Sequence, residues 1–251
     1  MDIKKTKVIT IASAKGGVGK STSSLVFSTL LSRDHEVLLI DLDTQASCTS
    51  YYYDKLKEQN IDITQTNIYK VLIASLNINN AIVNINDNLD FLGSYIELHK
   101  FVRENLPLKE RILKEFLLDL NIQYDYVILD TNPSLDATLG NALICSNYCI
   151  VPMTAEKWAV ESLELLKYYV RELRIKNMSI FLLSTRFKNN NSHKELLEHI
   201  KHDENFLGTV HEREDLNKRI ANNTGFDLSK DYIKEYEQSL INFINKIKVV
   251  R

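Results

Sequence analysis

The chain has 251 residues, a formal net charge of -2 and a hydrophobic share of 44%, which is typical of a soluble globular protein of one or two domains. The balance of Lys+Arg 31 against Asp+Glu 33 excludes a wholly basic nucleic-acid-binding protein, although it leaves room for a local basic patch. No apolar stretch approaches the roughly 18 residues of a membrane span, the polar start MDIKKTK differs from a signal peptide, and the three cysteines show no metal-ligand spacing. These features predict a cytoplasmic protein with reduced thiols.

The predicted strands are short apolar runs separated by helical patterns. The strands lie at residues 8–12, 36–40, 124–129, 148–151 and 179–184. The helices lie at residues 20–31, 108–120, 135–145, 158–173 and 193–201. Because the strands are apolar throughout rather than alternating, we expect both faces of a parallel sheet to be covered. Strands that alternate with helices predict an α/β fold with a doubly wound, mostly parallel sheet and helices on both faces.

Two further segments complete the prediction. Residues 51–90 are interpreted as peripheral helices with a hairpin or an edge strand. Residues 231–247 predict a last helix that packs on the sheet, because apolar side chains recur there at helical spacing. These side chains are Ile233, Tyr236, Leu240, Phe243, Ile244 and Ile247. No internal repeat or Pro- or Ser-rich linker divides the chain, so we expect a single domain over residues 1–251.

The glycines point to one site. Only seven glycines occur, and three of them fall within four positions, at Gly16, Gly17 and Gly19. Glycine allows a backbone to turn tightly or to approach a ligand closely. The sequence KGGVGKS at residues 15–21 follows a predicted strand and opens a predicted helix, as a phosphate-binding P-loop does. The alternative interpretation is a glycine-rich turn that only packs the strand against the helix.

A P-loop would use several groups together. Its backbone N–H groups and the helix N-terminus cradle phosphate oxygens. Lys20 would reach the β- and γ-phosphates of a nucleotide, and the Ser21 hydroxyl would bind Mg²⁺. The predicted nucleotide-binding residues are Gly16, Gly17, Val18, Gly19, Lys20, Ser21 and Thr22. The general pattern has one more glycine, where this chain has Ala14.

Acidic residues end two of the predicted strands, at the edge of the sheet where open α/β folds bind ligands. Asp130 closes the apolar run YDYVILD, which is typical of a metal-holding Walker B segment. Asp41 and Asp43 end LLIDLDTQ. Each aspartate alone could equally be a turn or capping residue, but the set together with a P-loop favours a metal site.

These motifs resemble those of the ParA/MinD family of deviant Walker ATPases, over most of residues 7–185. The family loop K-G-G-x-G-K-[ST], with its additional first lysine, is matched from Lys15 to Ser21. The family motif D-x-D-P-Q is matched by Asp41, Asp43 and Gln45, with Thr44 in place of proline. The Walker B motif D-x-P-P-S is matched by Asp130, Pro133 and Ser134, with Asn132 in place of the first proline.

The resemblance implies an ATPase that uses ATP and Mg²⁺. Lys15 would act in trans, on the phosphates held by the other subunit of an ATP-bound homodimer, much as an arginine finger does. The alternative for Lys15 is an ordinary surface lysine beside a P-loop. Asp43 would orient or activate the attacking water, and Asp41 and Asp130 would hold Mg²⁺ directly or through water. The changes at Thr44 and Asn132 bear on the rate of hydrolysis more than on the identity of the site.

Within the family, the short segment before the loop resembles the small ParA-type partition ATPases, which segregate plasmids or chromosomes. Such a protein binds double-stranded DNA non-specifically as an ATP dimer, and a ParB-type centromere-binding partner stimulates hydrolysis and releases it. We therefore expect nucleoid association within the cytoplasm. DNA would be held through its phosphates. The candidate residues are Arg186, Lys188, Arg213, Lys218 and Arg219.

Two alternatives stay open. Glu212, Glu214 and Asp215 lie among the candidate DNA-binding cations, so this stretch could be a solvated face of mixed charge. The chain could also be a membrane-cycling ATPase of the MinD type, because the tail INKIKVVR places Lys246, Lys248 and Arg251 among apolar residues. Membrane contact is not the expected outcome, because the apolar stripe before this tail more simply packs on the sheet.

Overall fold

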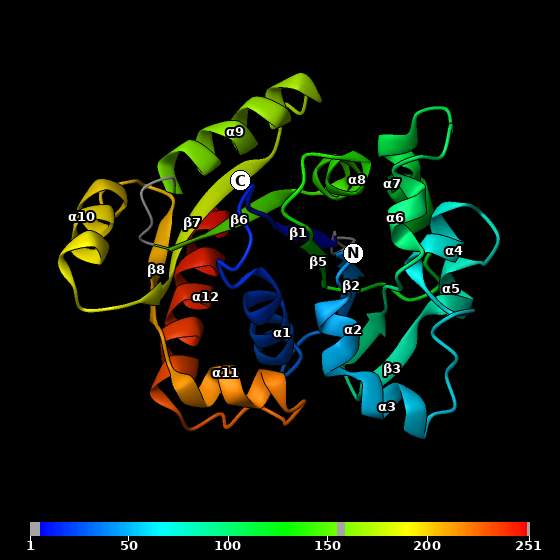
Figure 1. The fold of residues 1–251 in the computed structure, drawn as a ribbon, viewed down its shortest axis with the longest axis horizontal. Helices are drawn as coiled ribbons and strands as arrows, with labels where there is room; N and C mark the ends of the chain where they lie inside the picture. The colour runs from blue at the N-terminus through cyan, green and yellow to red at the C-terminus, as the bar shows by residue number, and fades with distance from the viewer. Residues whose placement is uncertain (1–5, 155–158, 250–251) are drawn as a thin grey trace.

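The computed structural model describes residues 6–154 and 159–249, and these form one sheet with helices around it (Figure 1). The strands are β1 (Lys7–Ile11), β2 (Val37–Leu42), β3 (Val83–Asn86), β4 (Leu89–Leu92), β5 (Tyr126–Thr131), β6 (Tyr148–Met153), β7 (Ser179–Phe187) and β8 (Phe206–His211). Their order in the sheet is β3-β4-β2-β5-β1-β6-β7-β8. Only β3 runs antiparallel to its neighbour, while the other pairs are parallel. The predicted doubly wound α/β fold is confirmed.

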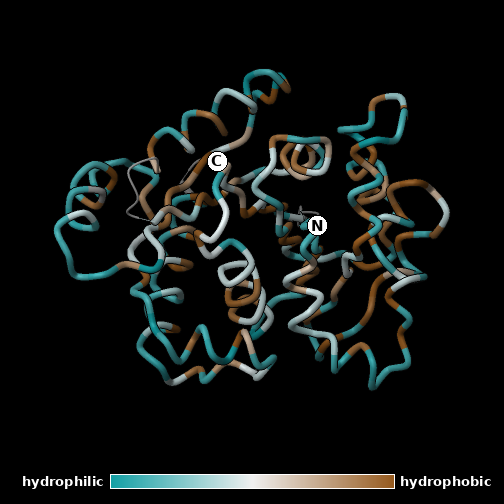
Figure 2. The backbone as a smooth tube through the Cα atoms, in the orientation of Figure 1, coloured by the Kyte–Doolittle hydropathy of each residue, from teal (hydrophilic) through white to brown (hydrophobic). Residues whose placement is uncertain are grey.

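The helices lie on both faces of this sheet. They are α1 (Lys20–Leu31), α2 (Ser47–Tyr51), α3 (Tyr53–Glu58), α4 (Ile68–Leu72), α5 (Ile78–Ala81), α6 (Leu98–Phe101), the 3-10 turn η1 (Lys109–Arg111), α7 (Ile112–Leu118), α8 (Ala137–Cys145), α9 (Ala159–Glu172), α10 (Asn191–Ile200), α11 (Glu214–Ala221) and α12 (Asp231–Val249). In Figure 2 the peripheral α10 is largely hydrophilic, whereas hydrophobic residues concentrate toward the sheet. This distribution is what burial of apolar surface against a central sheet produces.

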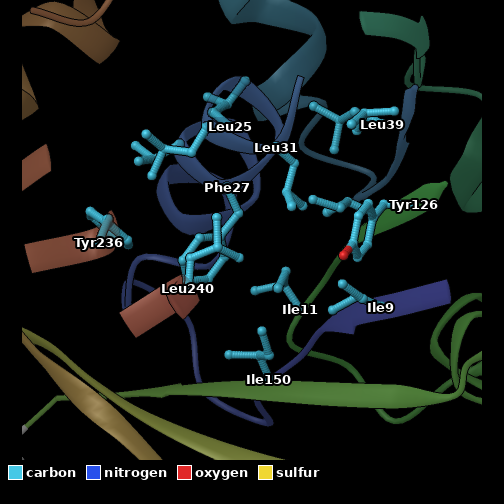
Figure 3. Close-up of a cluster of buried hydrophobic side chains, with 14 of the residues drawn as sticks. Ile9, Ile11, Leu25, Phe27, Leu31, Leu39, Tyr126, Ile150, Tyr236 and Leu240 are labelled. Carbon is cyan, nitrogen blue, oxygen red and sulfur yellow. The ribbon is translucent and has the colours of Figure 1, made fainter. Parts of the chain in front are cut away.

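One face of the sheet is covered by α1 and α12. Figure 3 shows Phe27 of α1 beside Leu240 of α12, with Ile9 and Ile11 of β1 next to them. The ring of Tyr236 packs edge-on against Phe27, with centroids 5.5 Å apart. On the other face, α4 to α8 cover β2 and β5, while α8 and α9 cover β6 and β7. Both faces of the central strands are therefore buried, as their uniformly apolar sequences predict.

The last helix is as predicted. Ile233, Tyr236, Leu240, Phe243 and Ile247 are all buried in the same core cluster, and Ile244 packs against it. The apolar stripe is thus covered by protein, as expected, and not presented for membrane contact. Among the described residues, no helix has the length and apolar character to cross a membrane. Arg251, which belonged to the membrane-docking alternative, lies outside the described residues.

Away from the central strands, the elements of the structure differ from the predicted ones or add to them. Of the two forms considered for the end of residues 51–90, a hairpin or an edge strand, the structure has a hairpin at the sheet edge, formed by β3 and β4. The helix predicted over residues 108–120 begins as the turn η1, because Leu108 has a left-handed backbone with φ 50. The start of the helix predicted from residue 158 falls on a residue outside the described part of the chain. Finally, β8 and α11 were not predicted, because FLGTVH is short, is interrupted by Gly208 and is only partly buried.

Candidate functional site

The glycine loop connects β1 to α1 and ends in two left-handed residues. Gly17 has φ 74 and Gly19 has φ 85, a conformation that is unfavourable for residues with a side chain. Gly19 is also the N-cap residue, directly before α1 begins at Lys20. Beta carbons at Gly16 and Gly17 would meet no atom within 4 Å, so this part of the loop borders open space. The loop therefore has the conformation and the clearance that a phosphate-binding loop needs.

Lys20, the first residue of α1, is nearly buried, with 6% of its surface exposed. Its Nζ donates a hydrogen bond to the Lys15 carbonyl oxygen at 3.0 Å. Burial lowers the pKa of Lys20, and the charges of Asp130 and Asp43 partly oppose this shift. The ammonium group is thus held at the loop by one carbonyl contact. An anion bound in the loop would give it a stronger partner.

Two aspartates face each other at the carboxyl edge of the sheet. Asp41 of β2 is paired in register with Asp130 of β5, and both are fully buried. Burial raises the pKa of Asp41, the neighbouring Asp130 raises it further, and hydrogen bonds from Thr49 oppose the shift. Burial also raises the pKa of Asp130, while hydrogen bonds from Ser21 and Ser24 lower it. Two adjacent buried carboxyl groups are an unfavourable arrangement that a bound cation would relieve.

The oxygens of the two aspartates have different partners. Asp41 accepts hydrogen bonds from the backbone nitrogen of Asp43 at 3.0 Å and from the nitrogen and hydroxyl of Thr49 at 2.9 and 2.8 Å. Asp130 accepts one from the Ser24 hydroxyl at 2.8 Å and a weaker one from the Cys48 thiol at 3.3 Å. Cys48 and Thr49 were missed by the sequence reasoning. The sequence feature that could have pointed to them is their position in the short helix α2, directly after the Asp41–Asp43 motif.

Asp43 is fixed by the turn that follows β2. Its Oδ1 accepts a hydrogen bond from the Gln45 nitrogen at 2.9 Å, and its carbonyl oxygen accepts one from the Ser94 hydroxyl at 2.8 Å. Although Thr44 stands where the family has proline, these contacts hold the turn. Asn132 likewise stabilises its own loop, because its amide nitrogen donates to Asp136 at 3.1 Å. Hydrogen bonds are thus present in both loops where the chain departs from the family motifs.

A cavity of roughly 380 Å³ lies at this edge of the sheet. Its walls include Asp43, Glu212 and Arg213, the last two directly after β8, and the loop residues Gly16, Gly17, Gly19, Lys20, Ser21 and Thr22. The β8 wall was not predicted, because β8 itself was not. Lys15 is half-buried next to the loop, and its backbone nitrogen donates a hydrogen bond to the Ser13 hydroxyl at 3.3 Å.

The side chains at this cavity fit a magnesium-bound nucleotide. The Ser21 side chain is hydrogen-bonded to Asp130, which places a hydroxyl and a carboxylate oxygen together beside the loop. Mg²⁺ prefers oxygen ligands and usually keeps contacts to water and substrate phosphates. In the part of the chain that the structure describes, no group of three His, Cys, Asp or Glu side chains is arranged to hold a metal. An ion here would therefore depend on Ser21, water and nucleotide phosphates as well as the carboxylates.

The five candidate DNA-binding cations lie near β7, β8 and α11, and each has an acidic partner. Arg186 and Lys188 both pair with Glu212, at 2.8 Å in each case. Arg213 lies 3.5 Å from Glu235. On α11, Lys218 pairs with Glu214 at 2.8 Å and Arg219 with Asp215 at 3.1 Å. Arg186 and Arg213 also line the cavity, so these two lie closer to the phosphate loop than the sequence suggested.

Comparisons with known proteins show the family to which the chain belongs. A family described as the AAA domain matches residues 6–182. The chain is similar to the sporulation initiation inhibitor protein Soj of Bacillus subtilis, with 34% identity over 169 residues, covering 66% of this chain and 65% of Soj. It is also similar to the chromosome partitioning protein ParA of Caulobacter vibrioides, with 31% identity over 185 residues, covering 69% of this chain and 66% of that protein. The region matched by the AAA family contains the phosphate loop and the aspartates.

A solved structure matches almost the whole chain. It is the crystal structure of a putative plasmid partition protein from Borrelia burgdorferi B31 bound to AMPPNP. The two sequences are 55% identical, the match covers 96% of this chain and 100% of that chain, and the TM-score is 0.94. The similarity therefore includes β8, α11 and α12, which lie beyond the matched AAA region.

Proposed function

Because the chain belongs to the ParA/MinD family of P-loop ATPases, we propose that it is a Mg²⁺-dependent partition ATPase that cycles on and off DNA. In this cycle the ATP-bound chain forms a homodimer and binds double-stranded DNA non-specifically. A ParB-type partner stimulates hydrolysis, and the DNA is released. The protein works in the cytoplasm on the nucleoid. The observation that carries the proposal is that the Lys20 loop and Asp43 line one cavity, with the buried Asp130 hydrogen-bonded to Ser21 of the loop and Asp41 next to Asp130 in the sheet.

The residues divide the chemistry among them. Backbone N–H groups of the loop and the Lys20 ammonium hold the phosphates, and this positioning supplies most of what phosphoryl transfer needs. Asp43 holds the attacking water in line. Lys15 reaches the phosphates bound by the partner subunit and neutralises charge that develops there. Ser21, with Asp41 and Asp130 directly or through water, would hold Mg²⁺, which would neutralise part of the charge on the phosphate oxygens.

DNA binding is assigned to the cations of β7, β8 and α11. Since each of them pairs with a carboxylate, DNA phosphates compete with those carboxylates for the cations. Lys188 and Lys218 are the most exposed, with side-chain exposures of 57% and 68%. Exposed ion pairs contribute little stability, so their exchange for DNA phosphates is feasible. The resulting binding is independent of sequence and weakens steeply with salt.

The test is duplex DNA binding by fluorescence anisotropy at low salt, with Mg²⁺ and ATP, with ADP and without nucleotide. We expect binding only with ATP, a steep loss with added salt, and phosphate release that depends on Mg²⁺. Lys55→Ala, on the exposed surface of α3, is the control for general effects of lost charge. Binding that is equal in all three nucleotide states would contradict the cycle.

If no state binds DNA while ATP is hydrolysed, a second assay decides between the branches of the family. Flotation with anionic vesicles, with and without ATP, then tests the membrane-cycling alternative. We expect no flotation, because the apolar stripe of α12 is buried against the sheet. ATP-dependent flotation would replace the partition cycle by a membrane cycle and would leave the ATPase site as described.

A further inference from the structure

We propose that Thr185 and Arg186, consecutive residues near the end of β7, position the phosphate loop by holding two of its carbonyl groups. This role would make both of them positioning residues for nucleotide binding. The inference rests on the proposed function only in that the loop binds nucleotide phosphates. Neither residue belongs to the phosphate-loop or aspartate motifs.

The Thr185 contact is buried. Its side-chain oxygen donates a hydrogen bond to the Val18 carbonyl at 2.7 Å and also approaches the Met153 carbonyl at 3.3 Å. Thr185 is 1% exposed. Water therefore cannot replace this hydroxyl easily, and its loss would leave the loop carbonyl without its donor.

Arg186 makes the second contact, with the carbonyl of the residue that precedes Val18 in the loop. Its Nη1 donates to the Gly17 carbonyl oxygen at 2.8 Å. The other nitrogens of the guanidinium, Nε and Nη2, donate to Oε1 of Glu212 at 3.1 and 2.8 Å. This fork fixes the orientation of the guanidinium, because a planar group held at two nitrogens has little freedom at the third. Glu212 therefore aims Arg186 at the loop.

The backbone of β7 is built to bring both side chains to the loop. Between β7 and β8 the register shifts, with Ser184 opposite Thr209 but Phe187 opposite His211. One more residue therefore lies on the β7 side, which is a β-bulge. Arg186 sits in this bulge with φ 51, a left-handed conformation that is uncommon for residues other than glycine. Bulges re-aim side chains near functional sites, and strained backbone tends to be kept where it serves a site.

Holding the carbonyls orients the N–H groups on the other side of the same peptides. In a trans peptide the C=O and N–H bonds point in opposite directions across a rigid plane. The Gly17 carbonyl shares its peptide with the Val18 nitrogen, and the Val18 carbonyl shares its peptide with the Gly19 nitrogen. Donors on β7 that draw both carbonyls outward therefore turn these two N–H groups away from β7, toward the inside of the loop where phosphates bind.

The test compares nucleotide affinities by titration with a fluorescent ATP analogue and Mg²⁺, in the absence of DNA. We expect Arg186→Ala and Thr185→Val each to raise the Kd about tenfold, the effect of losing one hydrogen bond that orients a charged-ligand site. Thr185→Ser keeps the hydroxyl and should restore the affinity to within about twofold. Melting temperatures of all variants show whether folding is retained.

The matched control is Arg33→Ala. Arg33 also pairs with a glutamate, Glu237, at 2.8 Å and has a similar side-chain exposure, but no contact with the loop is found among the described residues. We expect its Kd to equal that of the unaltered protein. Unchanged affinity in Arg186→Ala and Thr185→Val would overturn the inference. So would equal Kd values for Arg186→Ala and Lys188→Ala, because Lys188 shares Glu212 without donating to a loop carbonyl.

The same titration distinguishes failure of the proposed function from failure of the positioning role. If the unaltered protein binds no ATP analogue, the nucleotide site itself is wrong. If the unaltered protein binds the analogue and the two β7 variants bind it equally well, only the positioning role is wrong. A rise in Kd with kcat nearly unchanged at saturating ATP is the signature of a residue that orients the loop rather than reacts.

Discussion

Asp41 and Asp130 stand opposite each other on adjacent parallel strands, both fully buried and both with a pKa raised by that burial. The pair sits where β2 and β5 end, beside the first turn of α1. Without a cation between them, both carboxylates cannot be charged at little cost. Protonation of the pair and binding of a cation are therefore alternative ways of reaching the same stable state.

This pair predicts how stability depends on pH. The pKa of Asp41 is raised to about 8 and that of Asp130 to about 6, from a model-compound value of 3.8. Between the ordinary pKa of 3.8 and the raised values in the folded state, the folded protein binds more protons than the unfolded chain. The free energy of unfolding therefore falls as the pH rises through this range. We expect the melting temperature of the nucleotide-free protein to drop between pH 5.5 and 8.5.

Asp41→Asn should flatten this dependence, because the amide does not titrate. Addition of Mg²⁺ and nucleotide should raise the melting temperature more at pH 8.5 than at pH 5.5, since a cation favours the ionised pair. Thermal unfolding across the pH range, with and without Mg²⁺ and nucleotide, checks both statements. An unchanged slope in Asp41→Asn would show that other groups dominate.

Lys15→Ala should separate nucleotide binding from hydrolysis. Lys20 and the loop N–H groups remain, so the Kd for ATP should change little. The lysine that acts across the dimer is lost, and hydrolysis should fall about 10³-fold or more, as with a missing arginine finger. Light scattering after size exclusion should show no ATP-dependent dimer. An ATP-dependent dimer of normal size in this variant would contradict the trans role, and Lys57→Ala on α3 serves as the control.

Asp43→Ala should trap the ATP-bound dimer. The phosphate contacts stay intact while the water-holding carboxylate is gone, so hydrolysis should fall at least about 10²-fold and the dimer should persist. Asp43→Asn is the sharper variant, because an amide oxygen can still accept the hydrogen bond from the Gln45 nitrogen. Phosphate release and dimer lifetime are the measurements. Turnover at the normal rate in Asp43→Asn would exclude the assigned role.

Tyr236 joins the last helix to the helix of the phosphate loop. Its hydroxyl lies 3.2 Å from that of Ser23, and its ring packs on Phe27. Tyr236→Phe should lower the free energy of unfolding by about 1 kcal/mol, whereas Tyr236→Ala should lower it by about 3–5 kcal/mol. Urea unfolding followed by circular dichroism measures both. Tyr53→Ala, at an exposed tyrosine, should change it by less than about 0.5 kcal/mol.

The parts of the site that could be predicted from the sequence are formed by residues that lie close together along the chain. The loop, α1 and the strand-end aspartates follow from runs of neighbouring residues, and parallel pairing brings the strand ends together. Arg186 was assigned to DNA binding on charge alone. Its contact with Gly17 depends on a bulge in β7 and on Glu212 from β8, and no spacing along the chain carries that information.

The edges of the sheet were harder to predict than its centre. Central strands are buried on both faces and so are apolar throughout, whereas β8 has two buried and four half-buried residues and contains Gly208. The hairpin of β3 and β4 was anticipated only as a possibility within residues 51–90. Its strands have four residues each, too few for a periodic pattern to be distinctive.

The packing of α12 on α1 has a consequence for how a newly made chain acquires activity. The loop and α1 leave the ribosome early, but the part of α1 that packs against α12 stays uncovered until α12 has been synthesised and has docked. Contacts between segments so distant in sequence form late in folding. The nascent protein should therefore bind nucleotide poorly until α12 emerges. Nucleotide binding then begins only after α12 has packed on α1.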